Sequence, residues 1–88
     1  MASAKELNKG LSALDARLSL AIQELRKIHE EIETLGETQR ESFDNMPEGL
    51  QSSEKGQASE RRADEIEELA SNLDGFIDDL EGLAMEVY

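Results

Sequence analysis

The side chains of this chain that can take part in chemistry are mostly carboxylates, with one imidazole. Asp78, Asp79 and Glu81 can supply oxygen ligands to a divalent cation, but they lack the glycine-turned loop of a dedicated calcium site. We therefore expect a solvated acidic helix face and no metal. His29 has no second histidine or cysteine to share a metal and no serine or cysteine beside it, so we expect a surface or interface histidine. The sequence predicts no cofactor and no enzyme activity.

A second group of residues that can bind a ligand is basic and lies near the middle of the chain. A serine pair, Ser52 and Ser53, can open a helix there, and helix N-termini attract anions. Together these features predict a candidate phosphate or nucleotide site. The alternative is ordinary helix capping with ion pairs to neighbouring glutamates. The candidate anion-binding residues are Arg40, Lys55, Arg61 and Arg62.

The third group is a strip of acidic residues in the C-terminal part of the chain. The formal net charge is −12, and residues 63–88 hold no lysine or arginine. This charge disfavours direct binding to nucleic acid. It favours contact with a basic surface of a host protein, including a cleft that normally holds nucleic-acid phosphates, and the alternative is a solubilising flank. The candidate partner-binding residues are Asp64, Glu67, Asp74, Asp78, Asp79 and Glu81.

Two heptad patterns indicate the helices that position these groups. Apolar residues are spaced by four and three residues from Leu7 to Leu35 and by three and four residues from Ile66 to Val87. Folding the chain at Pro47 pairs the two patterns, with Ile28 opposite Ile66 and Leu14 opposite Leu80. The sequence predicts an all-α fold, an antiparallel two-helix hairpin forming one domain over 1–88. We expect helices over about 4–44 and 53–87, joined by a turn over about 45–52.

A further apolar row flanks this predicted seam and would be exposed on a single hairpin. Its members include Ile22, Ala70 and Ile77, so we expect them to form an oligomer interface. Two packed hairpins would bury the row in a four-helix bundle or coiled-coil assembly. The expected first partner is therefore the chain itself, as a homodimer or tetramer.

Composition excludes several other classes of protein. The chain has no cysteine, which rules out disulfides and thiolate metal sites. We expect no export signal, because no apolar stretch follows a basic N-terminal start. No stretch approaches the roughly 18 apolar residues of a membrane span, so we expect no membrane association. These features predict a cytoplasmic protein.

The turn itself carries a family resemblance. The string from Glu41 to Gln51, ESFDNMPEGLQ, resembles the turn of small acidic helical proteins of bacteriophages and prophages, which share D-N-(M/L)-P-E-x-L-Q between two helices. The resemblance covers about residues 37–57 and implies a phage accessory origin within a bacterial host cell. It carries over no catalytic or binding residue. The apolar residues Phe43, Met46 and Leu50 form a candidate contact surface at the turn.

These observations together predict a non-enzymatic accessory or inhibitor protein, such as an anti-defence protein. It would bind a host protein through its acidic face or its helical turn. One alternative is a protein that sequesters a phosphate or nucleotide at the basic cluster. A second is a structural coiled-coil adaptor within a phage complex.

Overall fold

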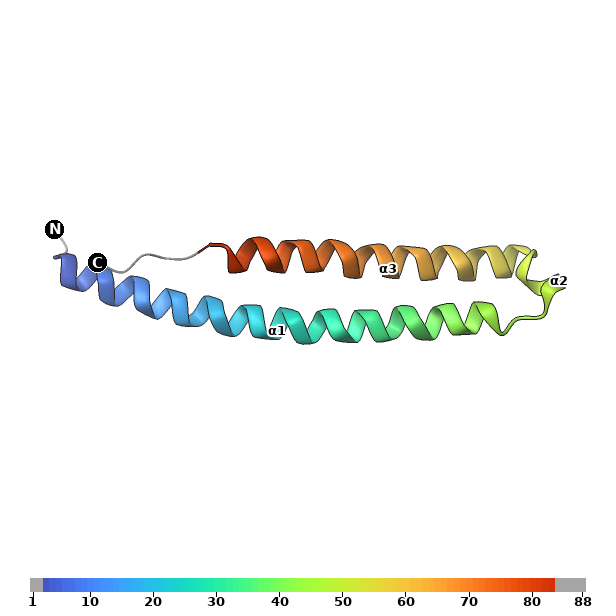
Figure 1. Ribbon diagram of the computed structural model, residues 1–88, viewed down its shortest axis with the longest axis horizontal. Coiled ribbons are helices and arrows are strands. Elements are labelled where there is room, and N and C mark those ends of the chain that lie inside the picture. Colours follow the sequence, from blue (N-terminus) through green and yellow to red (C-terminus); the bar gives the residue numbers. More distant parts are fainter. Residues whose placement is uncertain (1–2, 84–88) are drawn as a thin grey trace.

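The computed structural model is an all-helical hairpin, and it describes residues 3–83 (Figure 1). Helix α1 (Ala4–Asp44) and helix α3 (Glu54–Glu81) run antiparallel, and the single turn α2 (Glu48–Gln51) joins them. The hairpin is a rod about 70 Å long and about 16 Å wide. The described residues contain no strand, which confirms the all-α fold class. Helix α1 extends past the end of α3 at the far end of the rod (Figure 1).

The start of α1 is a capping box, as serine followed three residues later by glutamate favours. The hydroxyl of Ser3 accepts a hydrogen bond from the Glu6 backbone N–H at 3.2 Å. The Glu6 carboxylate accepts one from the Ser3 N–H at 3.4 Å. Helix α1 then continues through Gly36 to Asp44, so both predicted ends of this helix are correct.

The connection between the long helices is more structured than the predicted turn. Pro47 precedes α2, and the Gln51 side-chain amide donates to the carbonyl of Phe43 at 3.1 Å. Ser53 caps α3 by accepting from the Gly56 N–H at 3.2 Å. Because α2 occupies residues after Pro47, the chain reverses its direction at a later residue than Pro47, where the sequence predicts the reversal.

The predicted end of the second helix is partly wrong. Helix α3 ends at Glu81, where Gly82 is the C-cap and its N–H bonds to the carbonyl of Asp78. The prediction continued the helix to residue 87. Residues 84–87 lie outside the described part of the chain, so the error concerns Gly82 and Leu83.

Each helix was predicted to face the other with two residue rows, and one of the two is correct. The half-buried residues of the correct rows are Leu11, Leu18, Leu25 and Ile32 on α1 and Ile66, Leu73 and Leu80 on α3.

The second row of α3 in the seam was not predicted there. It is buried and has three small residues and one large one, spaced by seven residues: Gly56, Ala63, Ala70 and Ile77. Ala63 and Ile77 have no exposed surface. The assignment of Ala70 and Ile77 to an oligomer interface is therefore wrong, because both are buried inside the hairpin. Ile22, assigned to the same interface, is half-buried in one of the two rows of α1 that face α3.

The helices are also shifted along each other relative to the prediction. A Cβ atom at Gly36 would lie 3.2 Å from Ile66 Cγ2, so Ile66 packs against Gly36 and not against Ile28. The side chain of Ile28 is exposed. The physical reasons are the residues taken up by α2 and the close approach that glycine and alanine permit. The predicted pair of Leu7 with Val87 lies partly outside the described residues.

Candidate functional site

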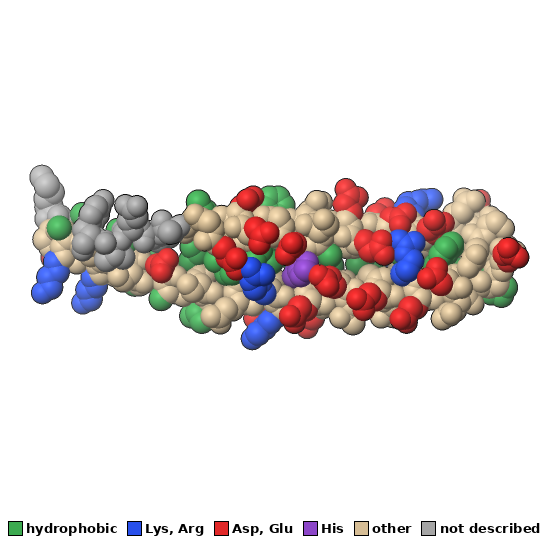
Figure 2. Space-filling model, viewed as in Figure 1, with side chains coloured by type: hydrophobic (Ala, Val, Ile, Leu, Met, Phe, Trp, Pro, Cys, Tyr) green, Lys and Arg blue, Asp and Glu red, His purple; other side chains and the backbone are tan. Residues whose placement is uncertain are grey.

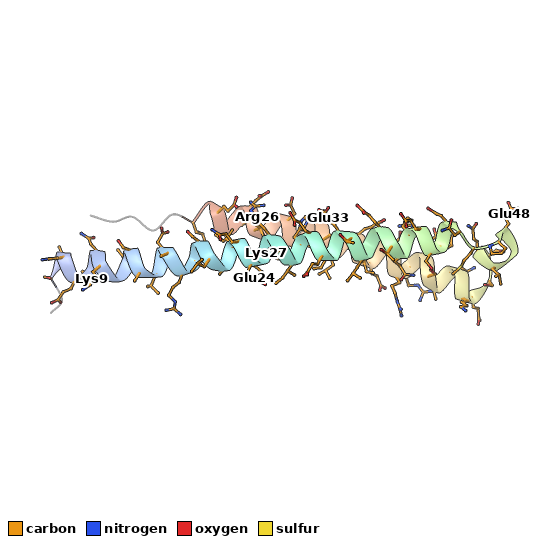
Figure 3. All side chains as sticks on the ribbon, turned by 90° about the horizontal axis from the view of Figure 1, so that it is seen from below. Lys9, Glu24, Arg26, Lys27, Glu33 and Glu48 are labelled. Carbon is orange, nitrogen blue, oxygen red and sulfur yellow. The ribbon has the colours of Figure 1, made fainter. Side chains whose placement is uncertain are left out.

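The seam is flanked by two long edges, and one of them is charged. We define the charged edge as six residues, each of which comes directly after a seam residue in the sequence. They are Arg26, Glu33 and Arg40 on α1, and Glu67, Asp74 and Glu81 on α3. Figure 2 shows acidic and basic side chains gathered along the junction of the helices. Arg26 and Glu33 lie on the same side of α1 (Figure 3).

Two arginines of α1 bridge the charged edge to α3. Arg26 donates from Nε to Glu81 Oε1 at 2.8 Å. Arg40 donates to Glu67 Oε2 at 2.7 Å and to Asp64 Oδ1 at 2.5 Å. The hydrogen bond from Arg40 lowers the pKa of Glu67 below its usual value, and the bonds to Glu67 and Asp64 raise the pKa of Arg40. The bond to Glu81 raises the pKa of Arg26, with smaller effects of Asp78 and Asp74.

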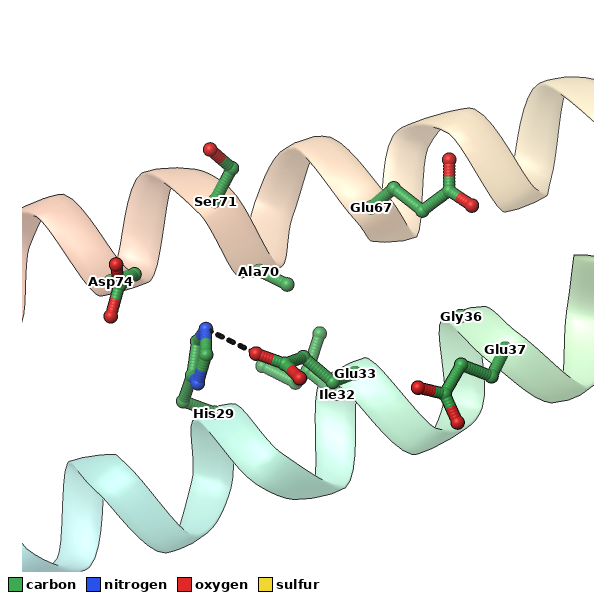
Figure 4. Close-up of a pocket in the computed structure, with 9 residues that line it drawn as sticks. All are labelled: His29, Ile32, Glu33, Gly36, Glu37, Glu67, Ala70, Ser71 and Asp74. Atoms are coloured by element: carbon green, nitrogen blue, oxygen red, sulfur yellow. Dashed lines mark ion pairs between the residues drawn. The ribbon is translucent and has the colours of Figure 1, made fainter.

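A hollow of about 400 Å³ opens on the charged edge around His29 (Figure 4). The imidazole Nε2 lies 3.1 Å from Glu33 Oε1, and the side chain of His29 is mostly buried in the seam. Asp74 and Glu67 reach the same hollow from α3. The predicted interface histidine therefore lies between the two helices of one hairpin.

The candidate acidic residues are all exposed, but the structure divides them into two groups. Asp64, Glu67 and Glu81 pair with arginines of α1. Asp74, Asp78 and Asp79 form no ion pair within the described residues. Asp79 lies apart from the charged edge, in a hollow beside Phe76. The role of these residues in partner binding stays a prediction.

The four candidate anion-binding residues do not converge on one site. Arg40 is held on the charged edge by its two carboxylates. Lys55 and Arg62 line a hollow of about 290 Å³ near the turn, and Arg61 does not line it. The other polar groups of that hollow are the side chains of Gln39, Ser42 and Ser59, and no carboxylate lines it. The prediction of one four-residue cluster is wrong.

The three turn residues are not equally accessible. Leu50 is exposed, whereas Phe43 and Met46 are half-buried. A contact surface at the turn would therefore present Leu50 first, with less of Phe43 and Met46.

The second edge is apolar, and the sequence analysis placed most of its residues in the seam. It lies on the side of the rod opposite the charged edge. On both helices its residues come directly before a seam residue in the sequence, whereas the residues of the charged edge come directly after one. The bulky members are exposed, and Phe76 is 66% exposed. The signal that could have revealed it is the third apolar row on α3, since a stripe wider than two rows is typical of bundle helices. We define the apolar edge as Leu7, Leu14, Ala21, Ile28 and Leu35 on α1, Leu69 and Phe76 on α3, and Leu83 just past the end of α3.

Two further properties bear on the kind of site that is present. Among residues 3–83, no cluster of three or more histidine or carboxylate side chains is arranged to hold a metal ion. The same residues form no helix that is both long enough and apolar enough to cross a bilayer. In comparisons with known proteins, no family model, no curated protein and no solved structure matches this chain.

Proposed function

We propose that this chain is a non-enzymatic accessory protein of the bacteriophage type that acts by binding a host protein with a basic surface. The observation that carries the proposal is the excess of unpaired acid on α3. Between Ala63 and Glu81 the helix has eight acidic residues and no basic one. Five of the eight form no ion pair within the described residues: Glu65, Glu68, Asp74, Asp78 and Asp79.

This excess acid supports partner binding through long-range electrostatics. Charges of one sign on a rigid rod raise the association rate with a surface of the opposite sign, and salt weakens the effect. Within the described residues, the arginines of α1 form ion pairs with Asp64, Glu67 and Glu81 but not with the other five. The phage origin rests on the resemblance of the turn alone.

The test is a quantitative pull-down from a bacterial lysate with two variants of equal charge change. The first neutralises Glu68, Asp74, Asp78 and Asp79 on α3 to glutamine or asparagine. The second neutralises Glu24, Glu30, Glu31 and Glu41 on α1 to glutamine. The proposal expects one host protein to be lost with the first variant and retained with the second, and its capture by wild type to fall with salt. Equal capture by both variants would remove the acidic residues of α3 from the mechanism.

A second candidate function, binding of a phosphate-bearing ligand, is favoured by the hollow of Lys55 and Arg62. It is lined by two cations and three polar side chains, in a protein with a large negative charge. Gln39 Nε2 donates to Ser59 Oγ at 2.9 Å and so holds part of the wall in place. Calorimetry with inorganic phosphate and nucleotides tests it. Binding that is lost in Lys55→Met/Arg62→Met and kept in Arg61→Met supports this candidate, and absence of binding to wild type contradicts it.

The proposed function also includes self-association of the hairpin. Two thin rods packed together would form the four-helix assembly that the sequence predicts.

A further inference from the structure

We infer that the apolar edge is the docking surface for a second copy of this chain. The inference deepens the self-association that is part of the proposed function, and it moves the interface away from Ala70 and Ile77. It starts from how the two rows of the apolar edge lie relative to each other.

Both rows lie on the same side of the rod. Arg26 pairs with Glu81, and Arg40 pairs with Glu67, so the residues that follow the seam on both helices meet on one side. The residues that precede the seam must then meet on the opposite side. Ser42 and Lys55, which belong to those preceding rows, line one hollow.

The apolar edge continues from that hollow toward the open end of the hairpin. Ten residues toward that end from the contact of Gly36 with Ile66, the two helices reach Arg26 and Phe76. Ile28 is therefore the member of the α1 row nearest to the level of Phe76, so two exposed apolar side chains lie close together. A twofold axis parallel to the rod would place Phe76 of each copy near Ile28 of the other, so the apolar surface of one copy meets the apolar surface of the second.

The exposed area is larger than a stable monomer of this size needs. The whole chain exposes 6861 Å². A compact monomer of this mass, 9.8 kDa, is expected to expose about 5,200 Å². The excess exceeds the roughly 800 Å² that each partner buries in a standard interface. The buried apolar core of the described hairpin is only Ala63, Ala70 and Ile77, so a second copy would supply most of a bundle core.

Charge decides between the two edges as the place for a second copy. Each copy carries a net charge of −12, and acidic side chains crowd the charged edge. Two charged edges brought together would repel each other. The α1 row from Leu7 to Leu35 and the α3 row from Leu69 to Leu83 hold no charged residue, so a second copy offers the same uncharged rows; nearer the turn the α3 row continues with Arg62 and Lys55, which are basic.

The test measures mass by sedimentation over a range of concentrations, for wild type, Phe76→Glu and Leu20→Glu. Phe76 and Leu20 are matched, at 66% and 65% exposed, but Leu20 points away from both edges on the outer side of α1. Wild type is expected at twice the 9.8 kDa of one chain. Phe76→Glu is expected to weaken the dimer by about 30-fold or more, as loss of a central aromatic does, and Leu20→Glu to leave it almost unchanged.

Several results would overturn the inference. Wild type at single-chain mass at every concentration excludes the dimer, and equal effects of the two variants exclude this edge. Circular dichroism of Phe76→Glu checks that the hairpin remains helical. If that variant loses its helices, a cysteine-labelling experiment replaces it. The labelling rate of the thiol in Ile28→Cys must fall as the protein concentration rises, while the rate in Leu20→Cys stays constant. A constant rate in both variants overturns the inference.

The same experiments separate this inference from the proposed function. If wild type is monomeric but still captures the host protein through its unpaired acids, the proposed function stands and the inference fails. If a monomeric wild type loses the host protein on Phe76→Glu, the apolar edge binds that host protein and not a second copy. If the dimer forms as expected but capture does not depend on the acids, only the proposed function fails.

Discussion

Gly36 of α1 lies directly against Ile66 of α3, and a Cβ atom at Gly36 would lie 3.2 Å from Ile66 Cγ2. This close approach sets the relative position of the two helices. It places the small row of α3 in the seam and leaves the leucine-rich rows on the apolar edge. The two different edges of the rod follow from it.

Burial of Ile77 makes it the main apolar anchor of the hairpin. It is the one large side chain with no exposed surface in the described residues. Ile77→Ala should lower the free energy of unfolding by about 2–5 kcal/mol, from lost transfer energy and the cavity left behind. Urea denaturation at one fixed protein concentration measures it. Leu20→Ala, on the outer side of α1, is the control and should change stability by no more than about 0.5 kcal/mol.

Two glycines of α3 should respond to alanine in opposite directions. A Cβ atom at Gly56 would lie 2.2 Å from the carbonyl oxygen of Leu50, so Gly56→Ala forces α2 and α3 apart. We expect a loss of about 1–3 kcal/mol, as for other overpacked sites. A Cβ atom at Gly75 meets nothing within 4 Å. Gly75→Ala should therefore stabilise the helix by about 0.5–1 kcal/mol, and thermal denaturation showing the same sign for both would contradict this packing.

The ion pair of Arg40 with Glu67 should give a pH-dependent contribution to stability. The hydrogen bond from Arg40 lowers the pKa of Glu67 in the folded state. A carboxylate with a lowered folded pKa stabilises the fold above its unfolded pKa, and this contribution is lost as the pH falls through the folded value. Arg40→Gln should therefore have a lower Tm than wild type at neutral pH. The difference should begin to shrink as the pH falls below the unfolded pKa of about 4.3, and it should be lost as the pH falls through the lower folded pKa.

The control for that measurement is Lys27→Gln, which removes the same charge from a lysine that forms no ion pair within the described residues. Its Tm difference should be small and almost independent of pH. If Lys27→Gln reproduces the profile of Arg40→Gln, the effect comes from net charge and not from the ion pair.

The sequence was sufficient to predict the two long helices and the residues that cap their starts, because these depend on local signals, but it did not predict the end of α3 at Gly82. Ser3 with Glu6 predicts the start of α1, and the region around Pro47 predicts the turn. The register was not predictable in the same way. Helix α3 has three rows with apolar members, and the α1 row of Gly36 also holds Asp15 and His29, which hydrophobic periodicity leaves out of a seam. Periodicity favours the rows with more leucine, such as that of Ile28, whereas the fold uses the row of Gly36, which permits closer packing.

The candidate sites also divide into features that the local sequence predicts and features that depend on the register of the two helices. Exposure of Asp74, Asp78 and Asp79 on α3 could be predicted, since acidic residues outside the seam stay in water. The pairing of Arg40 with Asp64 and Glu67, and its separation from Lys55, depends on the register. The apolar edge likewise appears only once the seam is known.

The central claim, that the seam runs through Gly36 and Ile66 and leaves the apolar edge exposed, is tested most directly by engineered disulfides. A Cβ atom at Gly36 lies 3.9 Å from the Cβ of Ile66, within the roughly 3.5–4.5 Å that disulfides span. Gly36→Cys/Ile66→Cys should form an intrachain disulfide on mild oxidation, detected by mass spectrometry. Ile28→Cys/Ile66→Cys should not, because Ile28 lies about 12 Å farther along α1. A disulfide in the second variant and none in the first would contradict the account.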